Sequence, residues 1–384
     1  MSPARVFTVF ALGFLIGVAL QSAFGFSWVI LQTIVFICLV LGVAGVGSSY
    51  KNCILVFFLL AAALAGFLRA GTFSPKPDDS EKSFWSVSRN HLTEKAKEIL
   101  PLPESAIFNA MVFGDTSEIP KDIKNDFNRT GTSHILAISG MNISIVAMML
   151  LNLCLLLGLW QKQAFWLAVL GVVVFVLLVG SPASAVRAGV MAVILLAAKN
   201  LGRLVRPWRP VILAAFFMVL LNPRLLVFNI GFQLSFLAVI GIMFFNGFWE
   251  NVFKWVPVKS LRELISLSMA AQITTWPLIL YNFGTVSVIS PLANIFMVPL
   301  LNPIMFFGLG FSAVSFSVWL SKMFLWPVWL ILKISIVVVE FFGSFSWASF
   351  NFGKAGLFFV FAYYPILFLF WKFLERKGWN DLSK

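Results

Sequence analysis

Long apolar runs separated by short polar or Pro/Gly-containing breaks dominate this sequence. A helix needs about 20 apolar residues to cross the hydrocarbon core of a bilayer. The chain has 60% hydrophobic and only 11% charged residues, so the runs cannot all be buried inside one soluble core. We therefore predict an all-α, polytopic transmembrane helical bundle with about 12 spans. The spans are expected near residues 6–24, 28–47, 53–69, 134–158, 164–180, 184–199, 209–223, 228–249, 264–281, 303–320, 323–343 and 356–373.

The start of the chain, residues 1–25, has a basic residue followed by an apolar stretch, as a signal peptide does. More membrane segments follow it, and no large soluble domain does, so we expect it to be retained as the first span. The domain organisation predicted from these patterns has three parts. They are N-terminal transmembrane helices in 1–70, an extracytoplasmic segment with short amphipathic helices in 71–133, and a transmembrane channel core in 134–384.

The basic residues indicate the orientation of the bundle. Residues 199–209 and the tail 372–384 are both net basic, and basic loops are retained in the cytoplasm. Counting spans from these two places puts both termini in the cytoplasm and residues 71–133 outside. The net charge of +13 agrees with such a topology and does not by itself indicate an anionic substrate.

Residues 282–302, "NFGTVSVISPLANIFMVPLLN", contain Pro291, Asn294 and Pro299. A full span here would place the basic tail outside the cell. We therefore predict a re-entrant or broken helix near 286–300, which is tolerated at membrane depth only inside protein or along a wet cavity.

Polar side chains interrupt several expected spans. On a regular helix His134, Asn142 and Asn152 fall within an arc of about 80°, with Ser139 about 60° from Asn142. These groups could bond neighbouring helices or face a hydrated route, and the sequence leaves both readings open. Arg187 lies inside another span, where an arginine costs roughly 2.5 to 3.5 kcal/mol on insertion scales. It could snorkel to headgroups, but its guanidinium also matches phosphate oxygens, and we favour a place in the route.

Further polar residues follow on later spans. Asn229 and Gln233 are one turn apart, and Ser268, Gln272 and Thr275 share a stripe. Each stripe alone is more typical of helix packing than of a site. Together they suggest a hydrated route through the bundle. The candidate residues of this route are His134, Ser139, Gly140, Asn142, Arg187, Asn229, Gln233, Gln272 and Asn294.

The sequence lacks the motifs of several activities. No GxxxxGK[ST] loop is present, which argues against ATP-driven transport, and neither the two histidines nor the three cysteines have zinc-ligand spacing. We expect no cofactor, no metal site and no enzyme activity. The alternative is an intramembrane hydrolase with Ser139 as nucleophile and His134 as base. These two residues point about 140° apart on a regular helix, and the flanks Ala137 and Met141 do not form a GxSxG elbow.

Four ordered motifs carry a family resemblance. "FGDTSEIPKDIKNDFNRTGTSHILAISGMNIS", "SPASAVRAGVMA", "NPRLLVFNIGFQLSFLAVIG" and "FGTVSVISPLANIFMVPL" resemble the competence domain of the ComEC DNA-uptake channel family over residues 100 to 373. By position, the resemblance carries over Gly114, Asp115, Gly131, His134, Ser139, Gly140, Arg187, Asn222, Pro223, Gly231, Gln233, Ser235, Pro291 and Asn294. Family members commonly have His where this chain has Asn142.

The resemblance implies an inner-membrane channel for uptake of single-stranded DNA into the cytoplasm during natural transformation. Full-length relatives also carry an OB-fold domain and a metallo-β-lactamase-like domain, and neither fits within these 384 residues. The expected function is a passive conduit in the bilayer, driven by an outer DNA receptor and a cytoplasmic helicase or motor. A separate nuclease and a homo-oligomer are compatible with it. The alternatives are the Ser139 hydrolase and a transporter of a smaller anionic solute.

Overall fold

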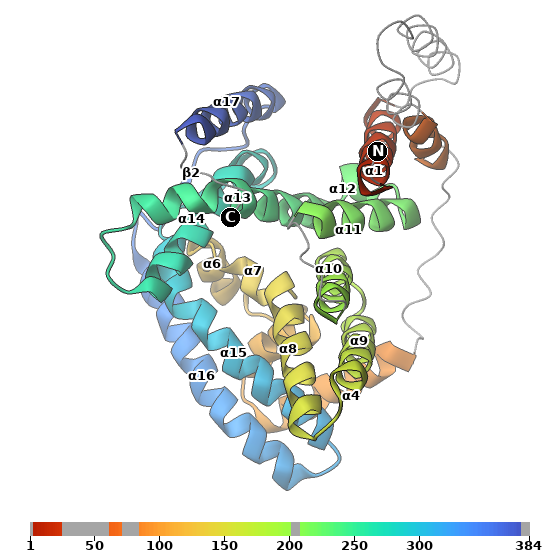
Figure 1. Cartoon of the computed structure of the whole chain (residues 1–384). Helices are drawn as coiled ribbons and strands as arrows, with labels where there is room; N and C mark the ends of the chain where they lie inside the picture. The colour runs from red at the N-terminus through yellow and green to blue at the C-terminus, as the bar shows by residue number, and fades with distance from the viewer. Residues whose placement is uncertain (1–2, 25–60, 71–83, 201–207, 378–384) are drawn as a thin grey trace, which may run out of the picture. The chain divides into compact units, whose positions relative to one another are not determined.

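The computed structural model describes residues 3–24, 61–70, 84–200 and 208–377 (Figure 1). The expected span 28–47 lies outside these residues. The described chain is almost entirely helical, as expected, and forms two compact units. One unit consists of residues 1–78 and 193–233, and the other of residues 79–192 and 234–384. Each is described by itself below.

In the first unit, helix α1 (Pro3–Phe24) packs against α11 (Trp208–Leu221) and the short α12 (Leu225–Phe228). The ring of Phe216 on α11 lies edge-on to those of Phe7, Phe10 and Phe14, with centroids 5.1 to 6.0 Å apart. Arg69 donates hydrogen bonds to the carbonyl oxygens of Leu220 (3.0 Å) and Leu221 (3.2 Å), which are among the last of α11. These contacts satisfy carbonyls that a helix end leaves without an intrahelical donor.

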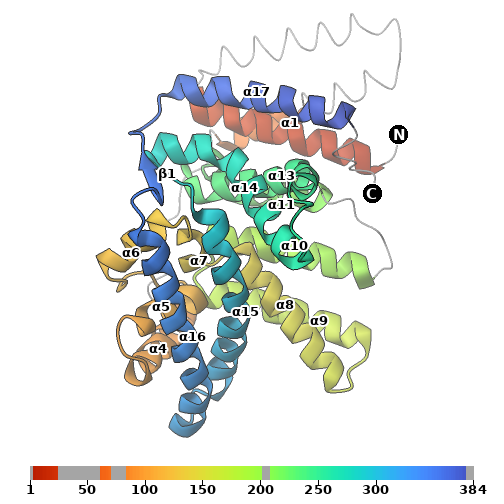
Figure 2. The ribbon, with the colours of Figure 1, turned by 90° about the vertical axis from the view of Figure 1, so that its left-hand side faces the viewer.

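The second unit contains the remaining helices. They are α4 (Phe84–Ile99), α5 (Glu104–Phe113), α6 (Lys121–Arg129), α7 (Ser133–Leu136), α8 (Gly140–Leu156), α9 (Gln161–Leu178), α14 (Lys259–Phe283), α15 (Ser290–Val314), α16 (Val318–Ser344) and α17 (Leu357–Arg376). Helices α10 (Ala183–Asn200) and α13 (Ile230–Val252) have residues in both units. Strands β1 (Thr285–Ser287) and β2 (Ser349–Asn351) pair antiparallel, with Val286 opposite Phe350. Helices α15 and α16 lie side by side, as do α8 and α9 (Figure 2).

Helix α5 lies at the centre of this unit. All ten of its residues are buried, and it contacts α4, α7, α15 and α16. Gly308 of α15 permits the close approach, since a Cβ at this position would be 2.9 Å from a methyl carbon of Val112. The helix ends where Gly114 takes the left-handed conformation, with φ of 76°. We expected an amphipathic helix here. Helix α5 is instead buried on every face, because other helices of the protein surround it.

Helix α6 packs against α16, α7 and β1, and its Phe127 is fully buried. Gly343 of α16 allows this approach, because a Cβ there would be 3.1 Å from Oδ1 of Asp126.

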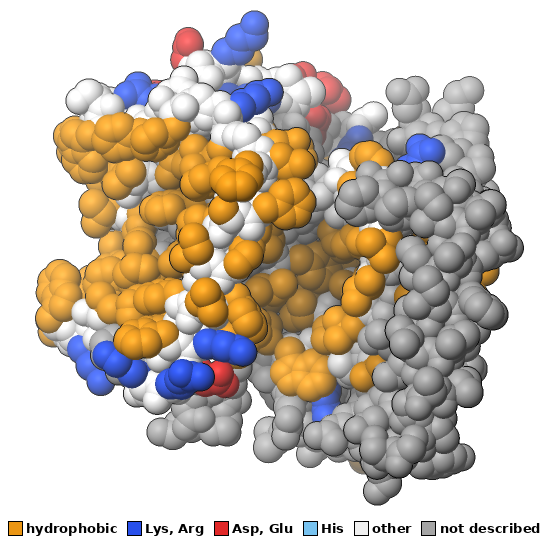
Figure 3. All heavy atoms as spheres, turned by 90° about the horizontal axis from the view of Figure 1, so that it is seen from above, with side chains coloured by type: hydrophobic (Ala, Val, Ile, Leu, Met, Phe, Trp, Pro, Cys, Tyr) orange, Lys and Arg blue, Asp and Glu red, His pale blue; other side chains and the backbone are white. Residues whose placement is uncertain are grey.

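Six described helices are long and apolar enough to cross a membrane, namely α9, α13, α14, α15, α16 and α17. Side chains of α17 such as Phe358, Phe361 and Leu369 are 65% to 86% exposed, as expected for a surface in contact with lipid. Seen from above, hydrophobic side chains cover much of the described surface, and few charged side chains lie among them (Figure 3).

The predicted re-entrant or broken helix near 286–300 is wrong. Residues 285–287 form β1, and α15 then continues without interruption from Ser290 to Val314. Pro291 lies in the first turn, where its missing N–H costs no hydrogen bond. Pro299 and Pro303 are inside the helix, and each removes one backbone bond. Membrane helices tolerate such prolines because neighbouring groups satisfy the freed carbonyls.

Candidate functional site

The expected span 134–158 is divided into two helices. Helix α7 ends at Leu136, α8 begins at Gly140, and Ala137 and Ser139 between them are extended, with ψ of 147° and 169°. His134 and Asn142 therefore do not share one regular helix face, which corrects the arc derived from the sequence. Asn152, near the far end of α8, is exposed.

Asn142 is completely buried and contacts α5. Its Nδ2 donates to the carbonyl oxygen of Met111 (3.0 Å), and its Oδ1 accepts a hydrogen bond from the hydroxyl of Ser139 (2.9 Å). These bonds give Asn142 a packing role, one of the two readings left open above. The hydrogen-bond partner of Ser139 is an amide oxygen and not a general base. The described residues show no hydrogen bond between His134 and Ser139.

Arg187 lies on α10 next to the beginning of α8. Arg187 is 6% exposed. Its Nη2 atom lies 3.3 Å from the position that a Cβ on Gly140 would occupy. Its guanidinium carbon lies 5.5 Å from the ring centroid of Phe236 on α13. Its Nε and Nη1 are buried without a hydrogen-bond partner, and no ion pair to Arg187 occurs among the described residues. A buried guanidinium without an acceptor is costly, so the site favours an anion.

A hydrogen bond from the preceding turn of α10 fixes Arg187 in position. Ser184, one turn earlier on α10, donates to the carbonyl oxygen of Ile138 at 2.6 Å. This bond joins α10 directly to the break that precedes α8. The sequence contained no signal for the contact of Arg187 with Phe236.

A second polar cluster surrounds Asn294, which is 6% exposed on α15. Its Nδ2 donates to the hydroxyls of Ser268 on α14 (3.1 Å) and Ser290 (3.5 Å). The Ser290 hydroxyl in turn donates to the carbonyl oxygen of Gly131 (3.5 Å). His134 is exposed, and its Nδ1 lies 3.1 Å from the same carbonyl oxygen. The structure thus joins His134 and Asn294, which are far apart in the sequence.

The remaining candidates have other surroundings. Asn229 accepts a hydrogen bond from the N–H of Phe232 (2.7 Å) at the beginning of α13. Gln233 donates to the carbonyl oxygens of Leu226 (3.0 Å) and Val227 (2.7 Å) of α12. Both residues therefore cap helix ends within the first unit. Gln272 is half-buried on α14.

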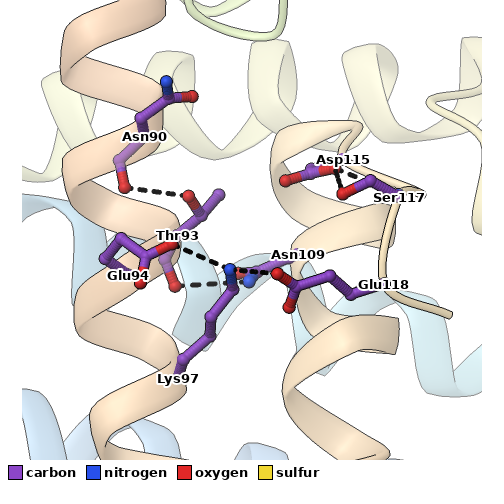
Figure 4. Close-up of polar contacts among 8 residues, drawn as sticks. All are labelled: Asn90, Thr93, Glu94, Lys97, Asn109, Asp115, Ser117 and Glu118. Atoms are coloured by element: carbon purple, nitrogen blue, oxygen red, sulfur yellow. Dashed lines mark hydrogen bonds and ion pairs between the residues drawn. The ribbon is translucent and has the colours of Figure 1, made fainter.

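Lys97 of α4 differs from Arg187 in having carboxylate partners. Lys97 donates to carboxylate oxygens of Glu94 (2.8 Å) and Glu118 (2.7 Å), as Figure 4 shows. The hydrogen bonds to Glu118 and Glu94 raise the pKa of Lys97 above its usual value. Exposed pairs of this kind contribute little stability. They show that this chain supplies carboxylates to a cation at the surface and none to buried Arg187.

The motif residue Asp115 follows α5 in the same region. Its Oδ1 accepts hydrogen bonds from the hydroxyl (2.6 Å) and the N–H (3.1 Å) of Ser117 (Figure 4). Burial opposes ionisation of Asp115, but these two bonds and the positive charges of Arg89 and Lys97 together outweigh it, and the pKa of the carboxyl lies below its usual value. Asp115 is therefore a carboxylate at neutral pH, and it stabilises the turn that follows Gly114.

No group of three or more His, Cys, Asp or Glu side chains that could hold a metal ion occurs among the described residues.

Comparison with known proteins identifies the family. Residues 111–377 match the model of the family described as "Competence protein". The chain is 30% identical over 211 residues to ComE operon protein 3 of Bacillus subtilis (strain 168), which covers 55% of this chain and 26% of that protein. It is 25% identical over 246 residues to the uncharacterized protein YcaI of Escherichia coli (strain K12), which covers 62% of this chain and 31% of that protein. No solved structure matches. Because the family match extends over most of its length, including α8, Arg187 and Asn294, this chain belongs to the competence protein family.

Proposed function

We propose that this chain forms an inner-membrane conduit that carries single-stranded DNA into the cytoplasm during natural transformation. Membership of the competence protein family and the similarity to ComE operon protein 3 support a role in competence. The membrane-capable helices support a multi-pass location in the bilayer. The matched segment is only about a quarter to a third of the length of these two relatives, so the activity of the whole relatives is part of the proposal.

The observation that carries the proposal is the unpaired guanidinium of Arg187. It is buried among helices of a membrane protein with no carboxylate paired to it among the described residues. DNA brings a phosphate for every nucleotide, and a guanidinium binds phosphate oxygens through two parallel hydrogen bonds. A cargo that supplies this missing anion would stabilise the site as it passes.

The remaining parts of the mechanism follow the expected topology. Both termini are cytoplasmic, and residues 71–133 face outward, where an outer receptor delivers DNA. A cytoplasmic helicase or motor supplies the driving force, because the sequence has no phosphate-binding loop for ATP. A separate nuclease removes the second strand. The chain itself acts as a passive wall and takes no chemical step.

The proposal is tested by DNA uptake in cells that lack this chain and are complemented with variants. Arg187→Lys keeps the charge but loses the two-pronged geometry, so uptake should be partial. Arg187→Gln should lower uptake about tenfold or more, as expected for the loss of charge-assisted hydrogen bonds. Arg224→Gln, which changes an exposed arginine, is the matched control and should behave like the parent.

The amount of each variant in the membrane is measured alongside uptake, because a lost packing contact would also abolish uptake. Normal uptake by a well-inserted Arg187→Gln protein would contradict the phosphate contact. A transporter of a smaller anionic solute would use the same guanidinium, but then deletion of the chain would leave DNA uptake unchanged.

A further inference from the structure

The first turn of α8 has amide groups without acceptors. The N–H groups of the first four residues of any helix have no partner inside the helix. A serine at the N-cap usually accepts one of these bonds through its side chain. Ser139 occupies this position but makes no such bond, and its hydroxyl donates to Asn142 Oδ1. In the part of the chain that the structure describes, the N–H groups of Gly140, Met141 and Asn142 donate no hydrogen bond.

Arg187 lies directly beside this uncapped turn. Its Nη2 is 3.3 Å from the position of a Cβ on Gly140, so the absence of that Cβ lets the guanidinium approach the backbone of this turn closely. The N-terminal end of a helix carries a partial positive charge. A positive helix end and a cation therefore face each other, and the buried guanidinium nitrogens Nε and Nη1 have no acceptor. This pair of charges is unfavourable unless an anion lies between them.

We propose that the N–H groups of Gly140–Asn142 and the guanidinium of Arg187 together form a binding site for a single phosphate group. Helix N-termini bind phosphate through backbone N–H groups, and a guanidinium adds two directed hydrogen bonds and a full charge. The bond from Ser184 to Ile138 holds α10 in register with this turn. If the proposed function holds, the phosphate is a backbone phosphodiester of single-stranded DNA. The anion site itself does not depend on that function.

Two substitutions of Ser139 test the site. Ser139→Asp places a carboxylate at the N-cap, where it would accept the free N–H groups and pair with Arg187. Aspartate is a favoured N-cap residue, so the helix should remain folded. Ser139→Ala supplies neither a charge nor an acceptor for these N–H groups and is the matched control. Arg187→Gln removes the guanidinium.

The measurement is thermal unfolding of the full chain, purified in neutral detergent, with inorganic phosphate titrated against chloride at constant ionic strength. Phosphate should raise the Tm of the parent and of Ser139→Ala, since a ligand that binds only the folded state stabilises it. The phosphate affinity of Ser139→Asp and Arg187→Gln should be about tenfold or more lower. An equal phosphate response in all four proteins, or none in the parent, would overturn the site.

A second arm uses a short oligothymidylate in place of phosphate. If it raises the Tm of the parent with the same dependence on Arg187 and Ser139, the site accepts a phosphodiester within a strand. If phosphate binds but the oligonucleotide does not compete, the anion site stands and the DNA conduit is contradicted. If Arg187→Gln lowers DNA uptake in cells while phosphate has no effect on the purified parent, the anion site is overturned and the conduit stands.

Discussion

Helices α8 and α15 both begin beside a serine that is followed within one turn by an asparagine. In α15, Ser290 and Asn294 bond to each other, to Ser268 and to Gly131, so protein groups take up most of the polar atoms. In α8, Ser139 and Asn142 bond to each other and to the backbone of α5, and the backbone amides of the first turn stay unbonded beside Arg187. The same residue types therefore join helices in one place and expose a positive helix end in the other.

The surroundings of Gly131, near the beginning of α15, differ from those of Gly140, at the beginning of α8. A Cβ on Gly131 would lie 2.7 Å from the Cβ of Ser290 and 2.8 Å from that of Ser287, so the α15 cluster is tightly closed. A Cβ on Gly140 would lie 3.3 Å from Nη2 of Arg187 and 3.7 Å from the Cβ of Ala188. The nearest neighbour of Gly140 is thus the end of a flexible side chain, whereas Gly131 lies against the Cβ atoms of two serines.

The largest expected effect comes from Gly131→Ala. Gly131 has a φ of 69°, which disfavours any residue with a Cβ, and the overlap with two serine Cβ atoms adds to the strain. We expect a loss of about 3 kcal/mol in the free energy of unfolding, measured by denaturant unfolding in detergent. Gly140→Ala should cost less than about 1 kcal/mol and should weaken phosphate binding instead. Equal destabilisation by both substitutions would contradict the difference between the two turns.

An intermediate effect is expected for the two asparagines. Asn142→Ala leaves the buried Met111 carbonyl and the Ser139 hydroxyl without their partners, which should cost about 1 to 3 kcal/mol. Asn294→Ala removes bonds of 3.1 and 3.5 Å from a side chain whose Oδ1 is already unpaired, so it should cost less. Thermal unfolding of both variants in the same detergent checks the order. The comparison fails if Asn294→Ala is the more damaging change.

The smallest effect is expected for Ser139→Ala. The hydroxyl caps no amide of α8, so its loss should change stability by less than about 1 kcal/mol and leave much of the DNA uptake intact. Ser139→Leu should lower uptake, because the bulkier side chain would intrude beside Gly140 and Arg187. The same serine also tests the hydrolase alternative through a serine-directed fluorophosphonate. Labelling of Ser139 by this reagent would favour a nucleophile over a packing residue.

Much of the site could be predicted from the sequence because the cost of burying charge is independent of fold. An arginine within an apolar run must find a partner wherever the helix lies, and the sequence indicated Arg187 for this reason. It could not predict which groups approach Arg187. Phe236 on α13 and Gly140 on α8 come from separate elements, and only tertiary packing brings them to Arg187.

The apolar runs by themselves determined a helical membrane protein, since backbone polar groups in lipid must be satisfied within each segment. The break at residues 137–139, the continuous α15 and the complete burial of α5 were decided only by the tertiary structure. Neighbouring helices supply the partners that make a break or an internal proline tolerable, and local periodicity contains no information about those neighbours. For the same reason, the spacing of Ser139 and Asn142 could not show that the amides of Gly140–Asn142 would remain free beside Arg187.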